Sequence, residues 1–222
     1  MNEASSDGKA PPALSVVIVA YNSAASLPAC VQALAAQTWR DFELIIVDNA
    51  SPQGEAQVCA AAHPFARLVE AGANLGFAAG VNLGARNAQG RWLVLLNPDA
   101  YPDPDWLEAL ADAATRHPKV ASFTSRQVMA ADRRLLDGLG DVMSAPAIPY
   151  RGGYLTPDPG DTAEGEVFSP CGAAMMVDRR VFPTPGGLGE GFFCYCGEVG
   201  LRHPPPPAGE PTPPLPPPPG AA

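Results

Sequence analysis

Two stretches of the sequence decide the fold: residues 14–22 read LSVVIVAYN, and residues 41–51 read DFELIIVDNAS. Each is a continuous run of mostly β-branched and apolar residues that ends in polar ones, as strands buried on both faces do. Between the two runs, Ser26 can cap a helix and Pro28 suits its first turn, which predicts a helix that ends near Thr38. A strand, a helix and a second strand of this kind form one unit of a parallel sheet.

The same alternation continues on the C-terminal side of this unit. The next predicted elements are, in order, a strand at 66–72, a helix at 77–89, a strand at 91–100, a helix at 106–118 and a strand at 119–128. The sequence therefore predicts an α/β, Rossmann-like fold with a mostly parallel sheet and helices on both of its faces. In such sheets a ligand binds beyond the carboxyl ends of the strands.

Composition and charge narrow the classes of function. The chain has 222 residues, the size of one large domain. It carries 14 basic and 23 acidic residues, for a net charge of -9, and has no basic stripe, so nucleic acid is not an expected partner. Its longest apolar runs are far shorter than the roughly 20 residues of a membrane-spanning helix.

The two ends of the chain differ from its body. Residues 1–13 are predicted to be a flexible N terminus, and they lack the apolar core of a secretory signal, which favours a protein that stays inside the cell. Residues 203–222 contain eleven prolines and are predicted to be an extended, disordered tail. The folded domain is therefore expected over residues 14–202.

The five cysteines form no C-x-x-C pair, so reduced thiols are expected.

Polar residues follow three of the predicted strands at the point where each one ends. They are Tyr21 and Asn22 after the first strand, Asp48 and Asn49 after the second, and Asn97-Pro98-Asp99 after the fourth. A parallel sheet brings these ends onto one rim, where one carboxylate can bind a base or ribose and another can hold a divalent cation against a diphosphate. Each could also be a plain turn residue, because Asn, Asp and Pro are common in turns. Three such ends together favour a binding rim.

Several motifs, taken in order, give the chain a family resemblance. They are V-x-Y-N at the end of the first strand, V-D-N-x-S at the end of the second, L-N-P-D at the end of the fourth, CGAAMMVDRRVF at 171–182 and FFCYC at 192–196. In this order they resemble the inverting glycosyltransferase family 2, especially its rhamnosyltransferase-like branch. The resemblance spans about residues 14–196. It implies a GT-A fold, a nucleotide-sugar donor and a Mg²⁺ or Mn²⁺ cofactor.

The resemblance also implies roles for residues of the rim. It places Tyr21 against the nucleotide base, Asp48 on the base or the ribose, and Asp99 on the metal ion. Asn97 occupies the first position of the family's D-x-D-like element. A single carboxylate would therefore hold the cation, and the oxygens of the diphosphate would supply more of its coordination shell.

Two further segments belong to the resemblance. Asn74 and Gly76, together with Asn82, lie in the family's donor-side stretch, although packing at the start of a glycine-rich helix explains them equally well. Gly172 lies in the segment that lines the donor-sugar and acceptor pocket of relatives, and a glycine there allows the backbone to approach a ligand closely. The side chains that follow it, from 174 to 176, are as consistent with a core strand as with a pocket wall.

The family pattern fails near the C-terminal end of the resemblance. Relatives read FFxYxED, then one residue, then Asp-Leu, and the second acid of their Glu-Asp pair is the general base. This chain reads FFCYCGEVGL, with Gly197, Glu198 and Gly200 at the three acidic positions. Glu198 is therefore the candidate catalytic base, and the alternative is a solvated loop acid.

Two functions fit these observations. The first is an inverting, metal-assisted glycosyltransferase of polysaccharide or cell-envelope biosynthesis, which moves a sugar to a glycan or lipid-linked acceptor. A cytoplasmic location, with peripheral association at the inner face of the membrane, would suit it. The second is a nucleotide-sugar-binding remnant with a broken acceptor side. A dinucleotide-dependent oxidoreductase is disfavoured, because Tyr21-Asn22-Ser23 stands where G-x-G-x-x-G would be needed. The sequence leaves the oligomeric state open.

Overall fold

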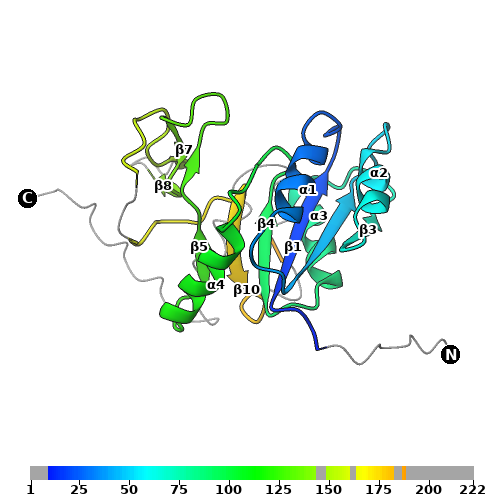
Figure 1. The fold of residues 1–222 in the computed structure, drawn as a ribbon, viewed down its shortest axis with the longest axis horizontal. Coiled ribbons are helices and arrows are strands. Elements are labelled where there is room, and N and C mark those ends of the chain that lie inside the picture. The colour runs from blue at the N-terminus through cyan, green and yellow to red at the C-terminus, as the bar shows by residue number, and fades with distance from the viewer. Residues whose placement is uncertain (1–9, 144–148, 161–163, 183–186, 189–222) are drawn as a thin grey trace, which may run out of the picture.

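The computed structural model describes residues 10–143, 149–160, 164–182 and 187–188 (Figure 1). The helices of this part of the chain are α1 (Leu27–Ala35), α2 (Glu55–Ala62), α3 (Phe77–Asn87) and α4 (Trp106–Arg116). The strands of the central sheet are β1 (Leu14–Ala20), β2 (Phe42–Asp48), β3 (Ala66–Glu70), β4 (Trp92–Leu96), β5 (Ser122–Thr124) and β10 (Ala174–Asp178). Two smaller sheets contain β6 (Gln127–Val128) with β7 (Leu136–Gly138), and β8 (Asp141–Met143) with β9 (Pro149–Arg151).

Some predictions fall on other parts of the chain. The Pro-rich tail at 203–222 lies outside the described residues, and so do residues 1–9 of the predicted flexible N terminus. The C-terminal end of the predicted domain, from residue 189 onward, lies outside them as well. Within the described residues, none of the helices is long and apolar enough to cross a lipid bilayer.

The central sheet is mostly parallel, as the sequence predicts. Its strand order is β3-β2-β1-β4-β10-β5, in which the first four strands run parallel and β10 runs antiparallel to both of its neighbours. Every residue of β1 is buried, which explains its uninterrupted apolar run. Because β1, β2 and β4 are parallel, their carboxyl ends meet at one edge of the sheet, at the top of Figure 1.

Apolar layers cover both faces of the sheet. On one face, Val16 and Ile18 of β1 share a core with side chains of α1, α2 and α4. On the other face, Val17 and Val19 share a core with α3. Gly84 explains how α3 packs so closely, because a Cβ at this position would come within 2.4 Å of Val17 Cγ1. The predicted arrangement of helices on both faces is confirmed.

Three elements differ from the predictions. α1 ends at Ala35, before Thr38, because the backbone N–H of Thr38 donates to the carbonyl of Pro104 instead (2.8 Å). The sequence does not predict α2, whose alanine-rich segment has only weak apolar periodicity. The single strand predicted at 119–128 is two strands, β5 and β6, and they belong to different sheets.

The chain between β5 and β10, residues 125–173, contains all four short strands, and we call it the insert. Figure 1 shows it at the upper left, on the same side as the carboxyl ends of β1 and β4. An ion pair between Arg133 and Asp103 (2.8 Å) joins it to the loop after β4. Two backbone hydrogen bonds between Asp141 and Ser169 (2.8 and 3.2 Å) join β8 to the segment that leads into β10. The insert is therefore tied to the edge of the sheet that holds the polar strand ends.

Candidate functional site

The edge formed by the carboxyl ends of β1, β2 and β4, which we call the rim, holds the residues that the sequence singles out. Tyr21 follows β1, and its side chain is 46% exposed. Asp48 is the last residue of β2 and is buried, while Asp99 follows β4 and is exposed. The strand register pairs Ala20 with Asp48, so the ends of β1 and β2 are direct neighbours. The sheet thus brings these three predicted residues to one edge.

The loop that carries Tyr21 is held by a buried carboxylate, Glu55. The backbone N–H of Ser23 donates to Glu55 Oε1 (2.8 Å), and the Ser23 hydroxyl approaches the same oxygen (3.3 Å). Burial by itself would raise the pKa of Glu55, but hydrogen bonds from its own backbone N–H and from Ser23 lower it below the ordinary value. Sequence reasoning missed Glu55, because it begins a helix that was not predicted.

Asp48 shapes the turn after β2. Its Oδ1 accepts the backbone N–H of Ser51 (3.0 Å), and its Oδ2 accepts Nε2 of Gln57 (2.9 Å). Asp48 therefore has the structural role in the turn that the sequence left open as an alternative. Each carboxylate oxygen can accept more than one hydrogen bond, so Asp48 also keeps acceptor capacity for a ligand.

Asn49 fixes the loop before α3. Its Nδ2 donates to Asn74 Oδ1 (2.9 Å), its Oδ1 accepts the backbone N–H of Leu75 (2.9 Å), and it is 2% exposed. Asn74 Oδ1 also accepts the backbone N–H of Gly76 (3.0 Å), a residue whose φ of +81° favours glycine. The predicted pair Asn74 and Gly76 is thus anchored at the rim beside Asp48. The sequence feature that could have identified Asn49 as a site residue is its position directly after a buried strand.

The segment Asn97-Pro98-Asp99 forms a tight turn after β4. The backbone N–H of Asn97 donates to Ala173 O (2.9 Å), and the carbonyl of Asn97 accepts the N–H of Ala100 (3.1 Å). Cys30 lies beneath this turn, and burial together with the charge of Asp99 raises the pKa of its thiol to about 12. The Cys30 thiol therefore stays protonated at neutral pH in the metal-free protein.

Asp99 has the chemistry that a divalent cation needs. Mg²⁺ and Mn²⁺ prefer oxygen ligands, and the Asp99 carboxylate is exposed, with no hydrogen bond or ion pair to the rest of the described chain. Within the described residues, the rim included, no group of three or more His, Cys, Asp or Glu side chains could hold a metal ion. A cation at Asp99 would therefore take most of its ligands from another molecule, and a diphosphate is suited to supply them.

Gly172 lies at the end of the insert, two residues before β10. The backbone N–H of Cys171 donates to Thr124 Oγ1 (3.2 Å) on one side of it, and Ala173 bonds to Asn97 on the other. Met175 and Met176, which follow it, are completely buried and belong to a core strand. Gly172 is itself buried, so its contact with a ligand stays a prediction.

Asn82 joins α3 to the chain beyond β10. Its Nδ2 donates to the carbonyl of Leu188 (3.0 Å), and its Oδ1 accepts the Leu188 backbone N–H (2.7 Å). Gly187 has a φ of +59°, and a Cβ there would lie 1.8 Å from Asn82 Oδ1, so glycine is required. The candidate base, Glu198, lies ten residues after Leu188 and outside the described residues. The other departures from the family motif lie outside them as well.

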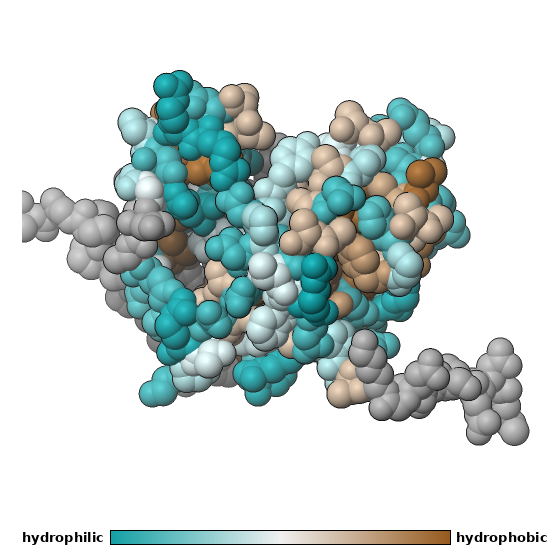
Figure 2. Space-filling model, in the orientation of Figure 1, coloured by the Kyte–Doolittle hydropathy of each residue, from teal (hydrophilic) through white to brown (hydrophobic). Residues whose placement is uncertain are grey.

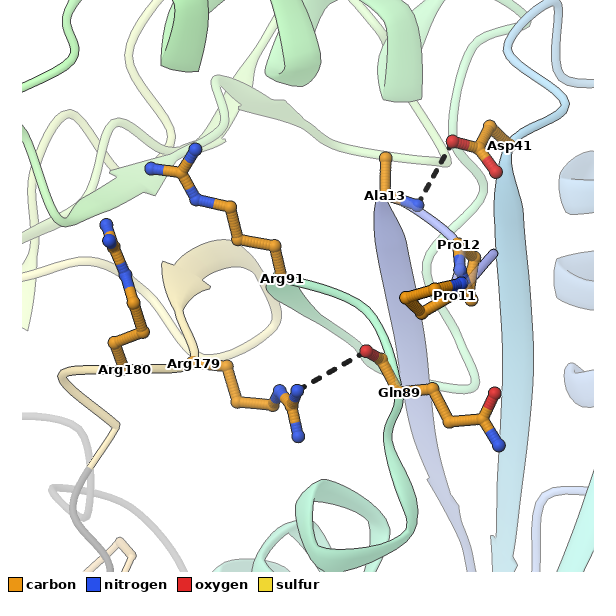
Figure 3. Close-up of a pocket in the computed structure, with 8 residues that line it drawn as sticks. All are labelled: Pro11, Pro12, Ala13, Asp41, Gln89, Arg91, Arg179 and Arg180. Atoms are coloured by element: carbon orange, nitrogen blue, oxygen red, sulfur yellow. Dashed lines mark hydrogen bonds between the residues drawn. The ribbon is translucent and has the colours of Figure 1, made fainter. Parts of the chain in front are cut away.

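A hollow lies at the edge of the sheet opposite the rim (Figure 3). Its lining residues are Pro11, Pro12, Ala13, Asp41, Gln89, Arg91, Arg179 and Arg180. Arg91 and Arg180 both pair with Asp178 (3.4 and 2.6 Å), and Arg179 donates to two backbone carbonyls. These cations already have partners, and none of the predicted site residues lines this hollow. The rim is therefore the better candidate site.

Comparison with known proteins identifies the family. The model of the family described as "Glycosyl transferase family 2" matches residues 15–182. The chain belongs to glycosyl transferase family 2. An N-acetylglucosaminyl-diphospho-decaprenol L-rhamnosyltransferase of Mycobacterium tuberculosis is 28% identical over 216 residues, which cover 85% of this chain and 68% of the relative. The succinoglycan biosynthesis protein ExoO of Rhizobium meliloti is 29% identical over 126 residues, or 56% of this chain and 36% of the relative.

Solved structures support the fold of this glycosyl transferase family 2 chain. The mannosyltransferase PcManGT from Pyrobaculum calidifontis, in complex with GDP-Man and Mn²⁺, aligns with a TM-score of 0.56 at 21% identity. S. aureus TarS 1-349, in complex with UDP, aligns with a TM-score of 0.61 at 14% identity. These alignments cover 81% and 85% of this chain, but the chain spans only 48% and 53% of the solved chains. The predicted GT-A fold and the family resemblance are confirmed.

Proposed function

We propose that this glycosyl transferase family 2 chain transfers a sugar, with inversion, from a nucleoside-diphosphate donor to a glycan or lipid-linked acceptor. The observation that carries the proposal is the rim, where Tyr21, Asp48 and Asp99 follow three parallel strands at one edge of the sheet. Family membership supports the reaction class. The nucleotide complexes of PcManGT and TarS support a nucleotide-bound donor.

The donor would lie across the rim from β2 to β4. The exposed ring of Tyr21 can stack on the base, and Asp48 can accept a hydrogen bond from the base or the ribose. Asn74 and Gly76 form the adjacent wall, which Asn49 holds in place. Gly172 lets the backbone approach the sugar on the side of β10.

Asp99 is the proposed metal ligand. Mg²⁺ or Mn²⁺ bound there supplies positive charge to the leaving diphosphate, which an acidic protein would otherwise repel. The Mn²⁺ in the PcManGT complex supports the use of a divalent ion. Asn97, at the first position of the element, offers a neutral amide oxygen, so Asp99 contributes the only charge of this turn.

The transfer step needs a base for the acceptor. Glu198 is the proposed group: its carboxylate takes the proton of an acceptor hydroxyl while that oxygen attacks the anomeric carbon of the donor sugar. The new bond forms on the face opposite the leaving group as the bond from the anomeric carbon to the diphosphate oxygen breaks. Inversion follows from this single displacement.

The acceptor and its location are the finer parts of the proposal. The rhamnosyltransferase of M. tuberculosis is named for a diphospho-decaprenol acceptor, which supports a lipid-linked acceptor for this chain too. An enzyme with such a substrate would associate peripherally with the inner face of the membrane from the cytoplasm. Transfer to an acceptor bound in vesicles, compared with the same acceptor head group free in solution, tests this part.

A second candidate function is donor binding without transfer. Gly197 and Gly200 replace two acids of the family motif, and this favours a remnant that holds the donor but lacks a working acceptor side. Thermal stabilisation by a panel of nucleotide-sugars with Mn²⁺, followed by a transfer assay, separates the two functions. Transfer that is abolished by Glu198→Gln supports the enzyme. Stabilisation without transfer supports the remnant, and neither signal with any donor contradicts both.

A further inference from the structure

Exposed apolar side chains concentrate at one place on the insert. The large apolar residues that are exposed in the described chain are Tyr21, Val58, Leu75, Tyr101, Val120, Tyr150, Tyr154, Leu155 and Val181. Three of these nine lie within the six residues 150–155, and two of the three are tyrosines, 56% and 51% exposed. The surrounding surface of the insert is mostly hydrophilic (Figure 2). Aromatic rings presented in this way on a polar surface are typical of a binding site rather than of a folding core.

Tyr150 and Tyr154 face one cavity. It has a volume of about 430 Å³, and its described lining residues are Tyr150, Arg151 and Tyr154. Arg151 donates through Nη1 to both oxygens of Asp137 (2.7 Å each), so its charge is matched by a partner on β7. The described part of the lining therefore offers two aromatic surfaces and polar groups without an excess of charge. This lining suits a neutral polar ligand better than a phosphate or a lipid chain.

Backbone hydrogen bonds hold the turn that carries Tyr154. Leu155 has a φ of +59°, a left-handed conformation that branched side chains rarely adopt. The turn keeps this conformation because Leu155 N–H donates to Leu136 O (2.9 Å) and Thr156 N–H donates to Gly153 O (3.0 Å). The backbone on which Tyr154 is presented is therefore well defined.

Hydrogen bonds trace a short path from these rings to the rim. Tyr150 on β9 pairs with Val142 on β8, and the neighbouring Asp141 makes two backbone hydrogen bonds to Ser169. That segment continues through Gly172 to Ala173, directly before β10, where the Ala173 carbonyl accepts the N–H of Asn97. The strand that carries Tyr150 is therefore connected, through β8 and this segment, to the proposed metal turn.

We infer that Tyr150 and Tyr154 form the acceptor subsite and bind a pyranose ring of the acceptor by stacking. A pyranose has one face of C–H bonds, which packs against the electron-rich face of an aromatic ring, and hydroxyl groups that bond to polar neighbours such as the Arg151–Asp137 pair. The inference rests on the proposed glycosyl transfer, because only a transferase needs a second sugar site beside its donor rim. It assigns the acceptor sugar to the insert and the donor to the parallel strands.

Binding of simple sugars by the full chain tests this inference. Saturation-transfer NMR is measured with the methyl glycosides of N-acetylglucosamine, glucose, galactose, mannose and rhamnose, on the chain as it stands and on four variants. Tyr150→Ala and Tyr154→Ala remove a ring, while Tyr154→Phe keeps the ring and loses only the hydroxyl. Val58→Ala, on α2, is the control for loss of an exposed apolar side chain elsewhere.

At least one glycoside is expected to bind, and each alanine variant is expected to bind it roughly three- to tenfold more weakly. Tyr154→Phe and Val58→Ala are expected to bind as the parent does. Equal binding by the alanine variants, or no binding of any glycoside, overturns the inference. A loss in Tyr154→Phe as large as that in Tyr154→Ala overturns stacking as the cause.

Binding of UDP, GDP and dTDP with Mn²⁺ is measured on the same samples. Intact nucleotide binding with no effect of the tyrosines contradicts only the acceptor subsite. Absent nucleotide binding contradicts the proposed function itself. The two failures are therefore distinguishable.

Discussion

The parallel half of the sheet and the insert are built on different physical principles. In the parallel half, β1, β2 and β4 are almost completely buried, and long apolar side chains on both faces set their positions. In the insert, the strands are two or three residues long, and Asp–Arg pairs, tight turns and single backbone bonds hold them. The first region is a rigid platform for the donor. The second region is the one to which we assign the acceptor.

This difference agrees with what each region must do. A nucleoside diphosphate is common to many donors, so a fixed rim at the strand ends suits it. Acceptors vary, and loops and short strands tolerate substitution better than a packed sheet does. The donor rim is therefore expected to depend on core packing, and the acceptor side on local contacts.

Gly90→Ala is expected to have the largest effect. A Cβ at Gly90 would lie 2.7 Å from the backbone atoms Leu14 C and Ser15 N, which begin the central strand and cannot move aside. The predicted loss of unfolding free energy is about 3 kcal/mol, measured by urea denaturation. Gly165→Ala in the insert is the control, because its Cβ would meet nothing within 4 Å. Equal denaturation midpoints for the two variants would contradict the claim that β1 is the rigid centre.

Asp48→Asn is expected to weaken nucleotide binding by about 2 kcal/mol, since a charge-assisted hydrogen bond to the ligand becomes a neutral one. Gln57→Ala is the control, because it removes the partner of Asp48 Oδ2 and leaves the carboxylate in place. Titration calorimetry with UDP, GDP and dTDP measures both. If the two variants lose affinity equally, Asp48 serves the turn and not the ligand.

Asp178→Asn tests, as a function of pH, the ion pairs at the end of β10 that include Arg91 beside β4. Hydrogen bonds from Arg180, opposed by burial, hold the pKa of Asp178 at about 2, below its ordinary 3.8. A lowered folded-state pKa gives stability that is complete above the unfolded value and disappears as the pH falls from about 4 toward 2. The variant is therefore expected to be about 1–2 kcal/mol less stable at pH 7, with the gap closing below pH 4. A gap that stays constant from pH 7 to pH 3 would rule out this ion pair as its cause.

Arg133→Ala is expected to have the smallest effect on global stability. Its pair with Asp103 is solvent-exposed on both sides, and such pairs contribute about 0–1 kcal/mol. Loss of this tie should nevertheless speed hydrogen exchange in the insert while the parallel strands keep their protection. Arg134→Ala is the matched control, because Arg134 pairs with Asp132 inside the same loop. Faster exchange in both variants, or in neither, would contradict a tie between the insert and the rim.

The sequence predicts the parallel half well because its signal is local. A buried strand such as β1 must be apolar throughout, and the polar residues after it mark the rim, so Tyr21, Asp48 and Asp99 can be placed without coordinates. The fold class and the family follow from the same runs and motifs. The position of Asn49 at the rim can be predicted for the same reason. Its role as an anchor for the loop before α3 cannot, because that role depends on a contact with a residue 25 positions away.

The rest depends on contacts that no local pattern reveals. α2 is rich in alanine and lacks a clear apolar stripe, so Glu55 and its bonds to Ser23 stayed hidden. The short strands of the insert carry no alternation long enough to detect, and their pairing depends on partners such as Asp137 and Arg151, which are 14 residues apart. The sequence could not single out Tyr150 and Tyr154, because only the fold places them together on one cavity of the insert.

If the rim binds a nucleoside diphosphate through a cation at Asp99, the affinity for the nucleotide must depend on the cation. Binding of UDP, GDP and dTDP is measured by calorimetry in Mn²⁺ and in a chelator, on the parent chain, on Asp99→Ala and on Asp112→Ala, an exposed acid of α4. We expect the parent and Asp112→Ala to bind at least one nucleotide only when Mn²⁺ is present, and Asp99→Ala to lose this dependence on the cation. Equal affinity of the parent chain in Mn²⁺ and in chelator would contradict the account.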